Sequence, residues 1–268
     1  MNIEDLYPYV LPSVRGCPHI TALGAIQASA AEFCRRTLIW RQTLPAVSSV
    51  LAAITFTAPL VAATSGTLSG PFAGATRSDY ILTFSDGTTQ MVTLNNGSTA
   101  VSWQQPVTAT ASATYSQVAY SLPTLTDAVI CKLLKFTVNG VKQTVATPEV
   151  GEDLTLYRFQ EDAAWLTDSS TFQVTPPPSV AGTQYGLTVA WQPTMTAMTL
   201  PDWIGQKHPE DIAYGALWRL ESMSWRQWSS EKDSQQNQAM FNDRIKTIAA
   251  QAAKGFGRGR VRSKARFF

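Results

Sequence analysis

The residues that could support catalysis are few, and their positions do not favour it. The chain has two histidines, His19 and His208, and each lies next to a proline at the expected start of a helix. A histidine that acts as a general base needs a nucleophile or a carboxylate at hydrogen-bond distance, and the sequence offers no sign of such a partner. We therefore interpret both histidines as helix-capping or surface residues.

Acidic pairs and signature motifs give the same result. The pairs Glu161-Asp162 and Glu210-Asp211 are adjacent in sequence, which suits a loop or a first helical turn better than glycosidase chemistry. The chain contains no GxSxG nucleophile turn, no phosphate-binding GxxxxGK[ST] loop, no GxGxxG after a strand and no HExxH zinc motif. The sequence thus predicts neither a catalytic site nor a cofactor.

The three cysteines, Cys17, Cys34 and Cys131, are widely spaced and odd in number. None belongs to a CxxC pair of the kind that binds metals. We expect buried free thiols of a protein that folds in a reducing cytoplasm, and we predict no metal site.

The most unusual feature is the basic C-terminal segment. Residues 254–268 contain six cations and no acid, so the net charge of +2 leaves −4 for the rest of the chain. Three interpretations remain open: an arm that orders against an acidic protein partner, a nucleic-acid-binding segment, and a solubilising tail. We rank them in that order. The segment consists of Lys254, Arg258, Arg260, Arg262, Lys264 and Arg266, with Phe267 and Phe268 at its end.

Composition indicates a globular protein with some of its surface covered by neighbours. Hydrophobic residues make up 44% of the chain and charged residues only 15%. The N-terminus lacks the basic and apolar regions of a signal peptide. Residues 42–76 carry no charge, but Pro45, Pro59 and Pro71 interrupt any run long enough to cross a bilayer. We expect no membrane partner.

Hydrophobic periodicity predicts helices at both ends of the chain and strands between them. Apolar residues at three- and four-residue spacing indicate two long helices, over residues 19–40 and 230–254, and a shorter one after Pro209. Residues 3–10 are expected to form a short helical turn. Alternating or β-branched segments bounded by turns predict strands over residues 44–58, 80–84, 91–94, 101–103, 108–115, 129–138, 154–159, 171–175 and 187–192.

Residues 59–117 differ in character from the segments on either side. Gly, Ser, Thr and Ala dominate there, and Asp86-Gly87 and Asn95-Asn96-Gly97 supply hairpin turns. We therefore predict an α+β fold: a helical bundle with a long C-terminal helix and a small antiparallel β-element, plus an inserted all-β, Ig-like or barrel-like module. The expected domains are a host (1–58 and 118–254), the insert (59–117) and a flexible basic arm (255–268).

Three segments of the expected host resemble the head-to-tail adaptor, or connector, proteins of tailed bacteriophages, podovirus-like adaptors in particular. Leu11-Pro12 and Gly16-Cys17-Pro18, followed by the helix that ends near Trp40, look like the opening of that family. Phe136 to Gly140, where Asn139-Gly140 supplies a hairpin turn, looks like its central hairpin. Val189 to Pro193, Leu200-Pro201-Asp202 and Ile212 to Leu220 are similar to its last strand, loop and small-residue helix.

The resemblance implies a structural virion protein at the head–tail interface, assembled in the host cytoplasm. Such proteins form a dodecameric ring below the portal protein, contact a tail tube or nozzle protein, and surround the genomic DNA during packaging and ejection. By this resemblance, the basic arm from Lys254 to Phe268 docks into the portal. The 59–117 insert departs from the family's plan and looks like a small β-module that recurs in phage virion proteins. We expect it to project outward from the ring, where it is free to contact tail fibres.

Two other functions compete with the adaptor hypothesis. In one, the β-insert is the functional part and the chain is a phage binding, decoration or fibre-anchoring protein. In the other, the basic segment makes the chain a DNA-binding accessory protein.

Overall fold

The computed structural model describes residues 1–73, 77–109, 111–146 and 163–254, which divide into two compact units. The first, called the helical unit here, comprises Met1–Arg41, Leu125–Cys131 and Ala190–Phe268. The second, called the strand unit, comprises Gln42–Thr124 and Lys132–Val189.

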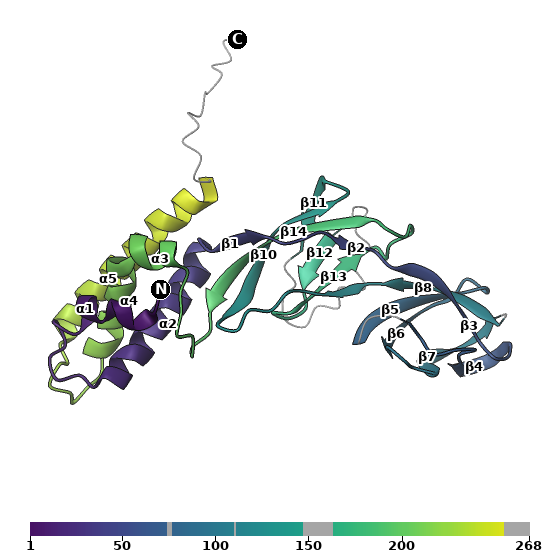
Figure 1. Cartoon of the computed structure of the whole chain (residues 1–268), viewed down its shortest axis with the longest axis horizontal. Helices are drawn as coiled ribbons and strands as arrows, with labels where there is room; N and C mark the ends of the chain where they lie inside the picture. Colours follow the sequence, from purple (N-terminus) through teal and green to yellow (C-terminus); the bar gives the residue numbers. More distant parts are fainter. Residues whose placement is uncertain (74–76, 110, 147–162, 255–268) are drawn as a thin grey trace, which may run out of the picture. The chain divides into compact units, whose positions relative to one another are not determined.

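The helical unit contains every helix that the structure describes (Figure 1). Helices α2, α4 and α5 pack against one another, and the short N-terminal helices and α3 cover them. The predicted helical turn at residues 3–10, the first long helix and the two C-terminal helices are confirmed, whereas α3 was not expected. The elements are η1 (Ile3–Leu6), α1 (Tyr7–Val10), α2 (His19–Thr37), α3 (Asp202–Lys207), α4 (Pro209–Glu221) and α5 (Glu231–Lys254).

The ends of the helices follow from local backbone chemistry. Helix α4 begins with Pro209, whose missing N–H costs nothing in a first turn, and the acids that follow it suit the positive end of the helix dipole. Helix α2 ends at Thr37, three residues before the predicted end, because Leu38 adopts a left-handed conformation with φ of 51°.

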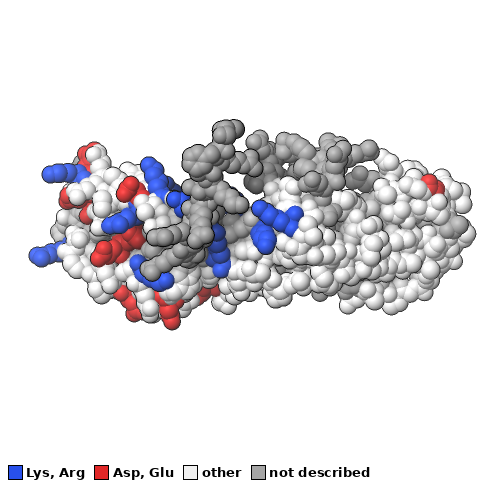
Figure 2. All heavy atoms as spheres, turned by 90° about the horizontal axis from the view of Figure 1, so that it is seen from above, with Lys and Arg blue, Asp and Glu red and all other residues white. Residues whose placement is uncertain are grey.

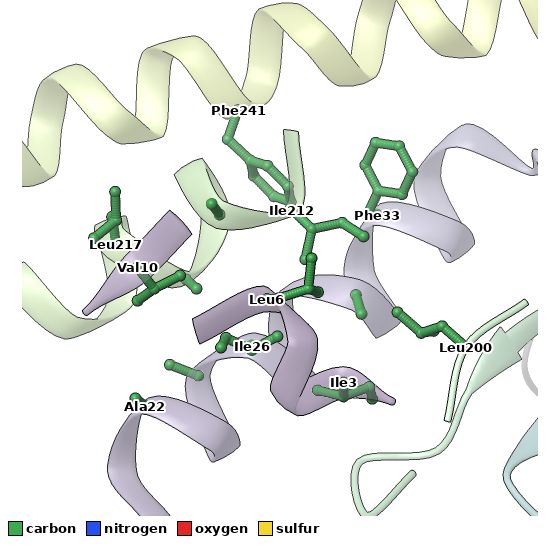
Figure 3. Close-up of a cluster of buried hydrophobic side chains, with 14 of the residues drawn as sticks. Ile3, Leu6, Val10, Ala22, Ile26, Phe33, Leu200, Ile212, Leu217 and Phe241 are labelled. Carbon is green, nitrogen blue, oxygen red and sulfur yellow. The ribbon is translucent and has the colours of Figure 1, made fainter. Parts of the chain in front are cut away.

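The core of the helical unit is one apolar cluster between these helices. In Figure 3, Phe241 of α5 points toward Ile212 of α4, and Leu6 and Ile26 lie on the other side of Ile212. All four side chains are fully buried. The amphipathic stripe of each helix therefore faces this cluster.

The largest sheet has eight strands, in the order β1-β14-β10-β11-β12-β13-β9, with β2 also paired to β14. Asn139 and Gly140, with φ of 48° and 82°, form the predicted turn between β10 and β11. The strands are β1 (Arg41–Thr43), β2 (Val47–Ser48), β9 (Ala119–Ser121), β10 (Ala128–Val138), β11 (Val141–Val145), β12 (Ala163–Leu166), β13 (Thr171–Thr175) and β14 (Gln184–Pro193).

The remaining strands of the strand unit form two smaller sheets around a second core. One sheet has the order β3-β8-β5-β6, and the other pairs β4 with β7. Phe72, Tyr80 and Tyr115 pack edge to face in this core, with ring centroids 5.1 to 5.4 Å apart. The strands are β3 (Leu51–Thr55), β4 (Leu60–Thr67), β5 (Arg77–Phe84), β6 (Thr89–Asn95), β7 (Ala100–Ala109) and β8 (Ser112–Gln117).

The expected α+β fold, a helical bundle with a small antiparallel β-element, is wrong. Among the described residues 39% lie in strands and 30% in helices, and the largest sheet joins strands from Arg41 to Pro193. The sequence indicated most of these strands, but it did not indicate that β1 and β2 pair with β14 more than 130 residues away. Such non-local pairing has no local sequence signal.

One predicted strand is divided in the structure, and another lies outside the described residues. Residues 44–58 do not form one strand, because Ser49 and Val50 separate β2 from β3, and the two strands join different sheets. The strand predicted at residues 154–159 lies outside the described residues.

Candidate interaction surfaces

The two histidines occupy structural positions at helix starts. His19 is the first residue of α2, is exposed, and lies edge-on to Tyr7 with ring centroids 5.1 Å apart. His208 precedes Pro209 at the start of α4, and its Nδ1 lies 2.9 Å from Oδ2 of Asp211. The Phe33 ring lies 5.3 Å from the His208 ring. His208 thus has a carboxylate partner that sequence reasoning missed.

The acidic pairs do not form a two-carboxylate site in the described residues. Glu210 and Asp211 both lie in the first turn of α4, as predicted. Asp211 contacts His208, and its carboxylate also lies 3.6 Å from Nε of Arg244 on α5. It therefore connects the start of α4 with the side of α5. The pair Glu161-Asp162 lies outside the described residues.

None of the three cysteines forms a disulfide, and burial suppresses the reactivity of Cys17 and Cys34. Cys17 and Cys34 are buried, as predicted, whereas Cys131 is half-buried. Loss of hydration raises the pKa of both buried thiols, Cys34 far more strongly than Cys17. A thiol must lose its proton to become a nucleophile or a strong metal ligand, so neither residue suits that chemistry.

Within the described part of the chain, no group of three or more His, Cys, Asp or Glu side chains is arranged to hold a metal ion. In the same residues, no helix has the length and apolar character needed to cross a bilayer.

A charged cluster fixes α4 against α2. The guanidinium of Arg219 contacts the Glu32 carboxylate and donates a 2.7 Å hydrogen bond to the carbonyl of Gly215. It also lies over the Trp218 ring, 4.8 Å from its centroid. Glu32 in turn accepts a 2.9 Å hydrogen bond from Arg36 one turn along α2. This cluster orients helices and offers no nucleophile.

Glu221 is the last residue of α4. Among the described Asp and Glu residues of the helical unit, it is the one whose pKa is raised by burial. Its side chain is only 5% exposed and accepts a 2.7 Å hydrogen bond from Asn237 of α5. Burial raises the pKa of the carboxyl, the negative charge of Asp233 adds to this, and the Asn237 hydrogen bond opposes it.

The raised pKa of Glu221 predicts a pH-dependent stability. An acid whose pKa is higher in the folded than in the unfolded state contributes to stability. This contribution is fully present below the unfolded pKa, and it is lost as pH rises through the folded pKa. We expect Glu221→Gln, which keeps the acceptor for Asn237, to remove this decline. The decline is measured by urea unfolding at several pH values between about 4 and 7, monitored by the circular dichroism of the helices. Parallel stability curves for the two proteins would rule out the shift.

Charged side chains gather over the helical unit. On the face shown in Figure 2, most blue and red atoms lie over the helices, and few lie over the two smaller sheets of the strand unit. This contrast agrees with the sequence, in which Arg77, Asp79 and Asp86 are the only charged residues between 42 and 124. Residues 42–124 therefore present mainly hydroxyl, amide and small apolar groups.

The predicted docking arm begins where the structure's description ends. Lys254 is exposed and is the last residue of α5. The other residues predicted for the arm lie outside the described residues: Arg258, Arg260, Arg262, Lys264, Arg266, Phe267 and Phe268.

Sequence reasoning missed the exposure of one tryptophan. Trp225, in the connection between α4 and α5, is fully exposed. The signal was a tryptophan among the serines and polar residues of the segment from Ser222 to Ser230.

The family model described as SU10 adaptor protein matches residues 75–263, well over half of the chain. A search of curated proteins finds no match.

Proposed function

Because the chain belongs to the SU10 adaptor protein family, a family of phage adaptors, we propose that it forms a ring below the portal protein and joins the head to the tail. In this proposal the ring is dodecameric, the DNA passes through its lumen, and the chain has no enzymatic activity. The protein is a structural component of the virion that contacts other virion proteins.

The extent of the family match carries this proposal. The match runs from residue 75 to residue 263, so it includes parts of both compact units. It also extends nine residues beyond Lys254, into the basic segment. The start of that segment is therefore part of the sequence that the family shares, which supports a role in assembly over a solubilising tail.

Helix α5 supports the assignment of the arm. It has 24 residues and hence a length of about 36 Å. Its buried residues, among them Phe241, Ile245 and Ile248, hold it against the core of the helical unit along most of this length. A segment that follows Lys254 thus leaves from a firmly packed helix, which suits an arm that binds a neighbouring protein.

The same proposal includes two other partners. The side of the ring away from the portal contacts a tail tube or nozzle protein. The nearly uncharged residues of the 59–117 segment contact tail fibres, because surfaces poor in charge are typical of protein interfaces.

Deletion of residues 255–268 tests the proposal. The deletion removes no described core residue, so the truncated chain should keep the full-length melting temperature. We expect the full-length chain to co-purify with the portal of its own phage and to add a coaxial ring in negative-stain images. The truncated chain should not bind the portal.

A second variant separates the charges of the arm from its phenylalanines. With the five basic residues of 255–268 changed to glutamine and Phe267 and Phe268 kept, partial binding would assign part of the affinity to the aromatic end. If the truncated chain binds the portal as well as the full-length chain, the arm assignment is wrong. If the full-length chain does not bind the portal, the position below the portal is wrong.

The DNA-binding alternative has its own readout. Cations that contact DNA phosphates release counterions, so affinity for duplex DNA falls steeply with salt, with a slope of about −0.9 per phosphate contact. Binding to DNA with a slope of about −5, together with no binding to the portal, would favour the DNA-binding accessory protein. Binding to fibres or cells through residues 59–117 would favour the binding or decoration protein.

A further inference from the structure

The connection between α4 and α5 presents a protruding tryptophan. Trp225 has an exposed fraction of 100%, and its backbone lies in the left-handed region with φ of 64°. This conformation is rare for bulky residues. Met223, two residues earlier, is 37% exposed.

The rest of this connection is anchored to the helical unit. The backbone N–H of Ser230 and the hydroxyl of Ser229 both donate to the carbonyl of Glu221, at 3.1 and 3.2 Å. Trp228 packs against the apolar cluster of the unit, and the guanidinium of Arg226 lies 5.9 Å from its ring centroid. Trp225 is thus held outward by a fixed loop, and it contributes nothing to the core of its own chain.

The same unit has an apolar cleft of about 420 Å³. This volume lies within the roughly 300–1,000 Å³ range of pockets that enclose organic groups. Its aromatic wall is Trp40, whose ring contacts the buried Trp191 with centroids 6.3 Å apart. The lining residues are Trp40, Leu125, Thr126, Asp127, Ala128, Thr199, Leu200 and Pro201.

One charged group lines the cleft. The carboxylate of Asp127 accepts a 2.7 Å hydrogen bond from the Thr199 hydroxyl, which fixes its orientation. A carboxylate at the wall of an apolar cleft is suited to accept from an indole N–H or to pair with a cation that enters beside an aromatic ring. Trp225 and Arg226 are adjacent in sequence and supply these two groups.

A chain cannot fill its own cleft with its own Trp225. The cleft includes Trp40, just beyond the C-terminal end of α2. The loop of Trp225 lies near the other end, because a Cβ on Gly16, three residues before α2, would be 3.5 Å from Oε1 of Gln227. Helix α2 has 19 residues, so about 28 Å separate the two features.

We propose that Trp225 of one copy of this chain inserts into the Trp40–Leu125–Leu200 cleft of the next copy, with Arg226 beside Asp127. The tryptophan and the cleft are different surfaces, so the contact is head-to-tail, and contacts of this type close into rings when the rotation between copies permits. This inference deepens the proposed ring by naming the residues that join its copies, and it rests on that proposal.

Photo-crosslinking identifies the occupant of the cleft directly. Benzoylphenylalanine is placed at position 225 of the full-length chain, and this chain is mixed with ¹⁵N-labelled unmodified chain and the portal of the same phage. After irradiation, mass spectrometry should find crosslinks from position 225 to ¹⁵N-labelled peptides that contain residues 125–128 or 199–201. The label separates contacts between copies from contacts within one copy.

Substitutions give a second, independent readout. Trp225→Ala removes the inserted side chain, and Leu125→Lys fills the cleft with a charged one. Each should weaken association between copies by about 30-fold or more, as expected for a central aromatic contact. Val141→Ala is the control, because Val141 is 63% exposed on the strand unit and lies outside both features. The melting temperature of the Trp225→Ala chain should equal that of the wild type.

The outcomes separate this inference from the proposed function. Crosslinks from position 225 to the portal, to another protein or to a different part of the chain would overturn the inference, as would unchanged association of the Trp225→Ala chain. If copies associate through the cleft but never join the portal, the proposed position below the portal fails and the contact between copies stands.

Discussion

Phe241→Ala should destabilise the helical unit by about 3–5 kcal/mol. The Phe241 ring is fully buried and lies between α4 and α5, 6.4 Å from the Trp218 ring centroid. Figure 3 shows it directed at Ile212 in the centre of the cluster. Its removal costs the transfer free energy of the ring and leaves a cavity that three packed helices cannot close. Urea unfolding followed by helical circular dichroism measures the loss.

The neighbouring residue provides the control. Met240 precedes Phe241 on α5 and is half-buried, so Met240→Ala removes apolar contacts without opening the centre of the core. We expect a loss of about 1 kcal/mol for this variant. A loss of similar size for both variants would mean that Phe241 is not central to the packing of α4 and α5.

Gly215→Ala should destabilise the same unit by about 1–3 kcal/mol, although alanine is the better helix former. An added Cβ at Gly215 would lie 2.7 and 2.8 Å from two ring carbons of Phe241, and it would also overlap the Ser29 hydroxyl. That hydroxyl donates to the carbonyl of Ile212, so it cannot move without losing a buried hydrogen bond. The missing side chain thus allows α4 to approach α2 and α5 closely.

Gly24→Ala is the matched control for this prediction. Gly24 lies within α2, and a Cβ there would meet nothing within 4 Å. The same substitution should therefore stabilise the unit by about 0.5–1 kcal/mol, through helix propensity alone. Melting curves of the two variants should shift in opposite directions. If Gly215→Ala also raised the melting temperature, the close approach of the helices would be disproved.

Local structure could be predicted from the sequence in both units. Helices α2, α4 and α5 were visible in the sequence, because helical hydrogen bonds join residues four apart and a buried face repeats every 3.6 residues. The turns at Asp86-Gly87 and Asn139-Gly140 were visible for a similar reason, since their conformation depends on one or two residues. Gly87 and Gly140 both have positive φ, as these turns require.

By itself, the sequence determined the main helices, most strands, the hairpin turns, the basic C-terminal segment and the resemblance to phage adaptors. Only the tertiary structure decided which strands share a sheet, as when β2 joins β14 and when β11 pairs with β12 in parallel. It alone revealed the protruding Trp225 and the cleft beside Trp40. The physical reason is that strand partners, side-chain exposure and cavities depend on contacts between residues far apart in the chain, which no local pattern encodes.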